Sequence, residues 1–261
     1  MSGGVRIVER LHAALSAPAA RVAVDRLVIG LGYTAVVLED GRAGLAYTWR
    51  DPVFGCSHQR GWGTAEGAPA SDLLDLLLVN GGLERSIGMA AANALNHAAA
   101  LELPEDEGAA GSLVRELDIV RGTRVSMVGF FPPVARVLED IGVELDVVDD
   151  AKGMGDQDAF RGRLGAWAEV LVMTSTTLLG DTADELLRAA GPEVRVALLG
   201  PTTPLMTAAF ERTRVGLLGG TVPLEVPEVL RAVRHGGGAR EVLPFCRKVY
   251  CVRRLGAGGA A

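Results

Sequence analysis

Continuous apolar runs alternate with segments of helical periodicity in the second half of the chain. The runs end in small or polar residues and cover residues 125–129, 145–149, 170–174, 194–200 and 215–219. Helix-like segments lie between and after them, at 134–141, 183–190, 204–210 and 226–233. Apolar strands that alternate with helices are typical of a parallel sheet covered on both faces. We therefore predict a doubly wound α/β domain over residues 111–261.

The first 110 residues show a different order of elements. They predict a helix over 7–15, strands over 22–31, 34–39 and 43–49, a helix from Ser71 through Leu78, and a long Ala-rich helix over 83–101. Asp40-Gly41 is a strong hairpin signal. Residues 102–111, with a proline and an acidic cluster, resemble a linker. A small α+β domain with an antiparallel sheet is therefore expected over residues 1–110.

The amino-acid composition limits the kinds of molecule that the protein is expected to bind. The chain has 26 basic and 32 acidic residues, a net charge of -6 and no long basic run, which argues against nucleic acid as a partner. No apolar run reaches the roughly 18 to 20 residues that a membrane span needs, and the N-terminus lacks an apolar signal core. Three scattered cysteines form no disulfide framework. A reduced, cytoplasmic protein is expected.

The carboxyl ends of the predicted parallel strands carry hydroxyls, glycines and one lysine. Ligands bind at this edge in open α/β sheets. The candidate ligand-binding residues there are Gly129, Phe130, Pro132, Asp149, Lys152, Thr174, Ser175, Thr176, Thr177, Gly200, Pro201, Thr202 and Thr203. Such groups suit phosphate, carboxylate or a chelated ion, although Ser and Thr could also cap the following helices. The first loop lacks the later glycines of a dinucleotide fingerprint, which disfavours nicotinamide chemistry.

Two further places in the first half carry candidate polar residues. Asn93 and His97 are spaced i and i+4 on the Ala-rich helix, where they could line a site or satisfy a neighbouring loop. The aperiodic stretch 51–69 holds Cys56 and His58, a pair of soft and borderline metal ligands. The alternative for this stretch is a surface loop with a small buried cysteine and an exposed histidine.

Four stretches together resemble the family labelled the putative heavy-metal chelation domain. They are residues 87–95, 129–133, 174–178 and 199–205. Members of that family join an enolase-N-terminal-like domain to a Rossmann-like domain. The resemblance implies a site in the cleft between the two domains and a metal or metal-bearing ligand. This chain departs from the family pattern at Gly180-Asp181, where Asn-Gly is usual, and at Val222-Pro223, where an acidic residue is usual.

Three functions remain open at this point. The first is binding of a metal ion, or of a metal-bearing or anionic small molecule, in that cleft, with a transition metal as the cofactor. The second is an enzyme acting on an anionic metabolite, in which Lys152, Asp149 and His97 would supply charge and proton transfer. The third is a scaffold, in which residues 248–252 add an edge strand or pair across a homodimer. No triad, paired-carboxylate or Walker spacing selects a reaction.

Overall fold

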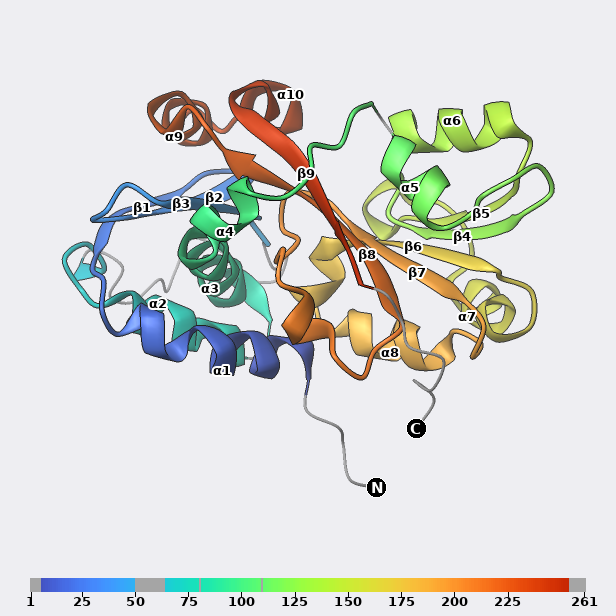
Figure 1. Cartoon of the computed structure of the whole chain (residues 1–261), viewed down its shortest axis with the longest axis horizontal. Helices are drawn as coiled ribbons and strands as arrows, with labels where there is room; N and C mark the ends of the chain where they lie inside the picture. The colour runs from blue at the N-terminus through green and yellow to red at the C-terminus, as the bar shows by residue number, and fades with distance from the viewer. Residues whose placement is uncertain (1–5, 50–63, 80, 109, 254–261) are drawn as a thin grey trace.

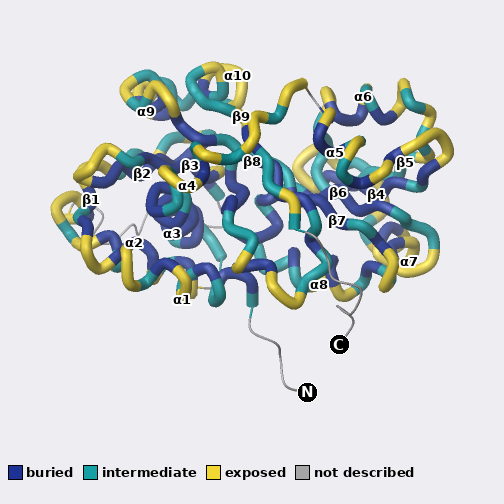
Figure 2. The backbone as a smooth tube through the Cα atoms, viewed as in Figure 1, coloured by how far each residue is buried: buried dark blue, intermediate teal, exposed yellow. Residues whose placement is uncertain are grey.

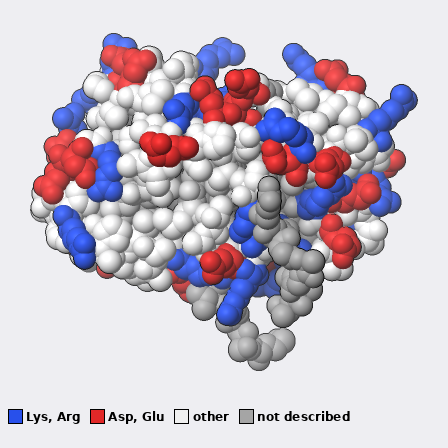
Figure 3. Space-filling view, viewed as in Figure 1, with Lys and Arg blue, Asp and Glu red and all other residues white. Residues whose placement is uncertain are grey.

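The computed structural model describes residues 6–49, 64–79, 81–108 and 110–253. Within these ranges the chain forms a three-stranded antiparallel sheet and a six-stranded, mostly parallel sheet (Figure 1). Among the helices of these ranges, none combines the length and the hydropathy that a membrane span requires. Acidic and basic side chains are interspersed on the face drawn in Figure 3.

The three-stranded sheet has the order β1-β2-β3 and follows α1, which spans Ile7–Ala19. Its strands are β1, Val24–Ile29, β2, Tyr33–Leu38, and β3, Ala43–Tyr47. Gly41 takes a positive φ of 84° in the turn between β2 and β3, as the hairpin signal predicts. The antiparallel α+β arrangement expected for the first half of the chain is therefore present.

Helix α3, Gly82–Leu95, covers one face of this sheet, after the short helices α2, Ala70–Leu74, and η2, Asp75–Leu78. A side chain at Gly44 would place its Cβ 2.2 Å from both the Ala90 oxygen and the Ala94 nitrogen. Only glycine therefore allows the helix backbone to approach β3 this closely. The small residues of the Ala-rich stretch serve this packing.

The long helix expected over residues 83–101 is instead two helices. α3 ends at Leu95 and α4 covers His97–Leu101. Asn96, at the break, has φ −90° and ψ 1°, and its Nδ2 donates to the Leu205 oxygen at 2.9 Å. A side-chain contact to a distant loop thus accompanies the end of the first helix.

The larger sheet has the strand order β5-β4-β6-β7-β8-β9. Its strands are β4, Arg124–Val128, β5, Glu144–Val148, β6, Val170–Thr174, β7, Arg195–Leu199, β8, Val215–Pro223, and β9, Cys246–Val252. The first five are parallel, and β9 pairs antiparallel with β8. The C-terminal stretch predicted over 248–252 is therefore an edge strand of the chain's own sheet.

Helices cover both faces of this sheet, which confirms the predicted doubly wound α/β fold. α5, Gly111–Glu116, and α6, Pro132–Ile141, pack on one face through Leu113 and Leu138. α7, Gln157–Ala166, and α8, Thr182–Ala189, pack on the other through Phe160 and Leu186. Figure 2 shows the buried backbone running through the central strands and α3.

The chain crosses back to the first sheet near its end. After β8, the helices α9, Val226–Arg234, and α10, Ala239–Val242, pack on the face of β1 and β2 that α3 leaves open, and η6, Leu243–Phe245, leads into β9. Val37 and Val229 belong to this cluster. The division of the chain at residues 110 and 111 remains a prediction, and α9 and α10 pack on a sheet that precedes it.

Candidate functional site

The carboxyl ends of β4, β6 and β7 lie side by side and next to the middle of β8, because Val128, Met173, Leu198 and Leu218 are register partners across the sheet. β4 has β5 on one side and β6 on the other, so the chain leaves β4 in one direction and later returns in the other. This reversal is the place where open α/β sheets bind ligands. The strand-end candidates are accordingly brought to one edge of the sheet.

Gly129 allows the ends of β4 and β6 to meet. Its φ is 81°, and an added Cβ would lie 2.8 Å from Thr174 Cγ2. The residue is therefore required both for its backbone conformation and for lack of space. Pro132 occupies the start of α6, where its missing N–H costs nothing.

Asp149 and Lys152 form a hydrogen-bonded pair around the Phe130 backbone. Asp149 Oδ2 accepts from the Phe130 nitrogen at 2.8 Å and from Lys152 Nζ at 2.6 Å, while Oδ1 accepts from the Lys152 nitrogen at 3.2 Å. Lys152 Nζ also donates to the Phe130 oxygen and lies 5.7 Å from the centroid of its ring. Burial raises the pKa of Asp149, but these hydrogen bonds outweigh it and the pKa is lowered. Asp149 is therefore a carboxylate whose two oxygens are already engaged.

The threonines after β6 bond mainly to one another. Thr174 Oγ1 lies 3.0 Å from Thr176 Oγ1 and accepts from the Thr176 nitrogen, and Thr177 Oγ1 donates to the Thr174 oxygen at 2.7 Å. This is capping of the short helix η4, Ser175–Leu178. Ser175 differs, because its Oγ is buried and has no hydrogen-bond partner in the described part of the chain. An added Cβ at Gly200 would lie 2.9 Å from that Oγ.

The loop after β7 connects the larger sheet to the first one. Thr202 Oγ1 accepts from the Tyr47 nitrogen at 2.8 Å, and the Thr202 oxygen accepts from Asn93 Nδ2 at 3.4 Å. Pro201 and Thr203 flank it, and Thr203 Oγ1 is buried without a partner among the described residues. This loop therefore holds β3 and α3 close to the carboxyl edge.

Asn93 and His97 both bond to backbone oxygens. Asn93 Nδ2 donates to the Leu45 oxygen at 2.8 Å. His97 Nε2 lies 2.9 Å from the Pro223 oxygen, and because a carbonyl only accepts, Nε2 carries the proton. Both contacts correspond to the alternative in which these residues satisfy neighbouring segments.

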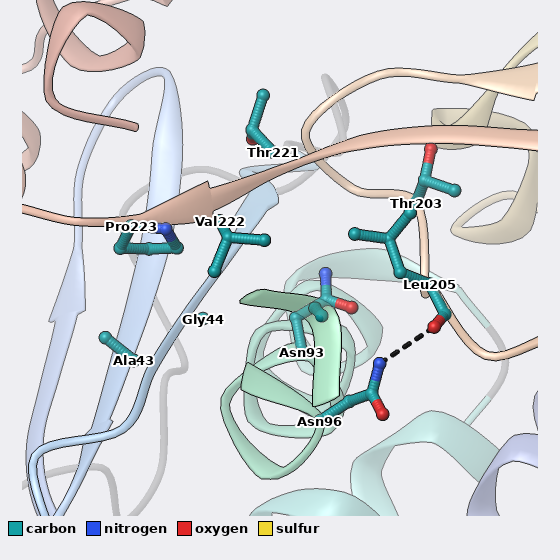
Figure 4. A pocket seen from close by; sticks show the side chains of 10 residues that line it. Ala43, Gly44, Asn93, Asn96, Thr203, Leu205, Thr221, Val222 and Pro223 are labelled. Carbon is teal, nitrogen blue, oxygen red and sulfur yellow. Dashed lines mark hydrogen bonds between the residues drawn. The ribbon is translucent and has the colours of Figure 1, made fainter. Parts of the chain in front are cut away.

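A small cavity lies beside Asn93, between α3, β3, the loop after β7 and β8 (Figure 4). It is lined by Ala43, Gly44, Asn93, Asn96, Ala100, Thr203, Leu205, Thr221, Val222 and Pro223. It has room for about one ordered water molecule. In Figure 4 the Thr203 hydroxyl points away from Asn93. This cavity is too small for a metabolite.

The candidates thus fall into two neighbouring groups. Gly129, Phe130, Pro132, Asp149, Lys152 and Thr174–Thr177 surround the ends of β4, β5 and β6, whereas Asn93, His97 and Pro201–Thr203 lie around β7 and β8. Ser175 and Gly200 lie where the groups meet.

Arg85 and Trp49 are not among the residues predicted from the sequence. Arg85 is fully buried on α3, four residues before Met89 on the apolar side of the helix. A charged residue inside an apolar helical stripe is a signal that could have identified it. Trp49 lies against Gly180, where an added Cβ would be 3.2 Å from its ring.

The described residues do not by themselves provide a metal centre. No three His, Cys, Asp or Glu side chains come together within the described ranges. Burial raises the pKa of Cys246 to about 12 and that of Cys251 to about 11, which disfavours the thiolate form that binds metals. Cys56 and His58 lie outside the described residues.

The protein is thus a two-sheet α/β protein. The polar residues at the carboxyl ends of its parallel strands face the smaller, three-stranded antiparallel sheet. Two family profiles, both described as "Putative heavy-metal chelation", match residues 113–252 and 12–96. The first covers more than half of the chain, so the protein belongs to that family, DUF364.

Two solved structures of family members share the fold. One, a protein of unknown function from Desulfitobacterium hafniense, is 20% identical with a TM-score of 0.76, covering 95% of this chain and 98% of the other. The second, from Pyrococcus horikoshii and also of unknown function, is 17% identical with a TM-score of 0.75, covering 95% and 100%. No curated protein matches the chain. These similarities show the fold alone.

Proposed function

We propose that the chain binds an anionic small molecule, or a metal ion carried by such a molecule, at the carboxyl edge of the larger sheet where it faces the three-stranded unit. The observation that carries the proposal is Ser175 Oγ, a buried hydroxyl without a partner among the described residues, at the meeting point of the two candidate groups. Buried polar groups are nearly always hydrogen-bonded, so an unpaired one in a strand-end loop needs a partner.

The donor set favours an organic or chelated ligand over a bare ion. The edge has a half-exposed ammonium group at Lys152 and a buried hydroxyl at Ser175, but no cluster of three acidic, His or Cys ligands within the described ranges. A metal ion that is already chelated by the donor atoms of an anionic molecule needs fewer ligands from the protein. The family description supports a metal in this role, and Cys56 and His58 are the residues we propose as its direct ligands.

Native mass spectrometry and elemental analysis of protein purified without an affinity-metal step test this proposal. We expect a stoichiometric metal or an additional mass of an acidic organic molecule. Ser175→Ala and Lys152→Ala should each reduce its occupancy. A clean apo mass, together with no binding of Zn²⁺, Cd²⁺ or inorganic phosphate in titrations, would contradict the proposal.

The direct ligands are tested separately. If Cys56 and His58 hold the metal, Cys56→Ala and His58→Ala abolish stoichiometric Zn²⁺ and Cd²⁺ binding. Cys251→Ser is the matched control, because burial raises the pKa of that thiol to about 11 and disfavours the thiolate, so its loss should leave the stoichiometry unchanged. Equal binding by the Cys56 and His58 variants and the wild type would remove both residues from the site.

A further inference from the structure

We call the three-stranded sheet with helices α1 to α4 the first unit. Arg85 reaches from α3 of the first unit to the segment that directly follows η4 in the unit of the larger sheet. Its Nε and Nη2 donate to the Val79 oxygen at 3.0 and 2.5 Å. Its Nη1 donates to Asp181 Oδ1 at 2.5 Å and to the Leu179 oxygen at 3.4 Å. The guanidinium thus ties residues 179 and 181 to its own unit, and its side chain is fully buried.

The backbone conformation of residues 179–181 suits this contact. Asp181 has a φ of 59°, in the left-handed region that a residue other than glycine adopts at a cost. A carboxylate there places a negative charge on a buried arginine, and Arg6 adds a second contact to Asp181 Oδ1 at 3.3 Å. Because an unpaired buried charge is strongly destabilising, Asp181 supplies the countercharge that the buried guanidinium needs.

The same segment is held on a second side. Gly180 has no side chain, and an added Cβ would lie 3.2 Å from the ring of Trp49. The Leu179 nitrogen donates to the Thr176 oxygen at 2.9 Å, so residues 179–181 are connected directly to η4. A displacement of Leu179 or Asp181 would therefore be transmitted to Ser175 and Thr176.

We propose that the guanidinium of Arg85 is a positioning group that fixes residues 179–181, and through them η4, against the first unit. The inference rests on the proposed function in one respect: the part of η4 that it fixes includes Ser175, at the edge where we place the ligand. Arg85 itself contacts neither Ser175 nor Thr176 in the hydrogen bonds described above, so its effect on binding is indirect.

Hydrogen exchange of the full-length, ligand-free chain, measured by mass spectrometry, tests the positioning role. Arg85→Met keeps the side-chain volume without burying an unpaired charge, and Arg85→Lys keeps the charge without the planar fork. We expect peptides that cover residues 175–182 to exchange about tenfold faster in both variants, while β4 and β7 keep their protection. Arg163→Met is the control, because it removes a more exposed Arg–Asp pair, to Asp146, away from this segment.

The inference would be overturned if residues 175–182 exchanged at the wild-type rate in either Arg85 variant. Side-chain volume alone, or charge alone, would then be enough to hold the segment in place. Equal acceleration throughout the chain would also overturn it, since that result means general destabilisation. Titration with Zn²⁺ alone and with inorganic phosphate alone provides the second readout, and about tenfold weaker binding is expected for Arg85→Met. If the wild type has a clean apo mass and binds neither probe nor Cd²⁺, the proposed function fails, while hydrogen exchange still decides the role of Arg85.

Discussion

At the residue scale, two glycines with positive φ separate the effect of backbone conformation from the effect of space. Gly129 has a φ of 81° and faces Thr174, whereas Gly153 has a φ of 63° and nothing within 4 Å of an added Cβ. Gly153→Ala should therefore lower the free energy of unfolding by about 1–2 kcal/mol, the cost of the left-handed region alone. Gly129→Ala should cost about 1–3 kcal/mol more, as overpacking does. Urea unfolding of both variants measures the difference, and equal losses would contradict the steric role.

Asp149 gives the second prediction at this scale. Its folded-state pKa lies below the ordinary value of 3.8, so its contribution to stability is complete above that value and is lost as pH falls through the folded-state pKa. Asp149→Asn should cost about 1–3 kcal/mol at pH 7, typical for a hydrogen bond to a charged group. The loss should shrink when urea unfolding is repeated near pH 3.

The control for that measurement is the neighbouring Asp150, which is exposed. Asp150→Asn should change the free energy of unfolding by less than about 0.5 kcal/mol, as for most surface substitutions. If the Asp149 variant lost the same amount at pH 7 and near pH 3, the carboxylate would not be the source of the stability.

At the element scale, α9 is the test of packing between distant segments. Leu230 is 2% exposed in the cluster that covers β1 and β2, whereas Leu224, just before the helix, is 53% exposed. Leu230→Ala should lower the free energy of unfolding by about 2–5 kcal/mol, as for other buried leucines. Leu224→Ala should lower it by less than about 0.5 kcal/mol. Thermal or urea unfolding of the pair checks this, and similar values would mean that the α9 contact adds little.

The sequence predicted the parallel strands well, because strands covered on both faces are continuously apolar. The run at residues 170–174 coincides with β6, and the other four differ from the observed strands by a few residues at their ends. α7 was not predicted, because only Phe160 and Leu164 of its residues are buried and two glycines interrupt it. The helix expected over residues 204–210 is only η5, Thr207–Phe210. Local periodicity cannot report such short or weakly amphipathic elements.

For the candidate site, the sequence predicted which strand ends would meet but not how their side chains are used. The run of threonines could be identified from its position after β6, yet the bonds of Thr174 to Thr176 depend on the geometry of the turn. The pairing of Arg85 with Asp181 joins residues 96 positions apart, and no local pattern encodes it. The assignment of Cys56 and His58 stays a prediction.

At the scale of the whole molecule, the predicted division at residue 110 can be tested with a fragment. Residues 1–110 contain the three-stranded sheet but not α9 and α10, so Tyr33, Val37 and Leu45 would lose their cover. Isolated small sheets with one exposed apolar face are marginal in water. We expect this fragment to bind a hydrophobic dye and to lack dispersed amide signals in NMR spectra. A well-folded fragment that binds no dye would show that the first unit is stable alone.

The packing of α9 on β2 also has a consequence for the order of folding during synthesis. Val37 and Val229 belong to one cluster but lie about 190 residues apart, and ribosomes add about 5–20 residues each second. The apolar face of the first sheet must therefore wait roughly 10–40 seconds for its cover. Contacts of such long sequence separation also slow refolding in vitro. The nascent chain of this protein consequently passes through an aggregation-prone intermediate. The yield of folded protein should therefore depend on chaperones and on the speed of translation.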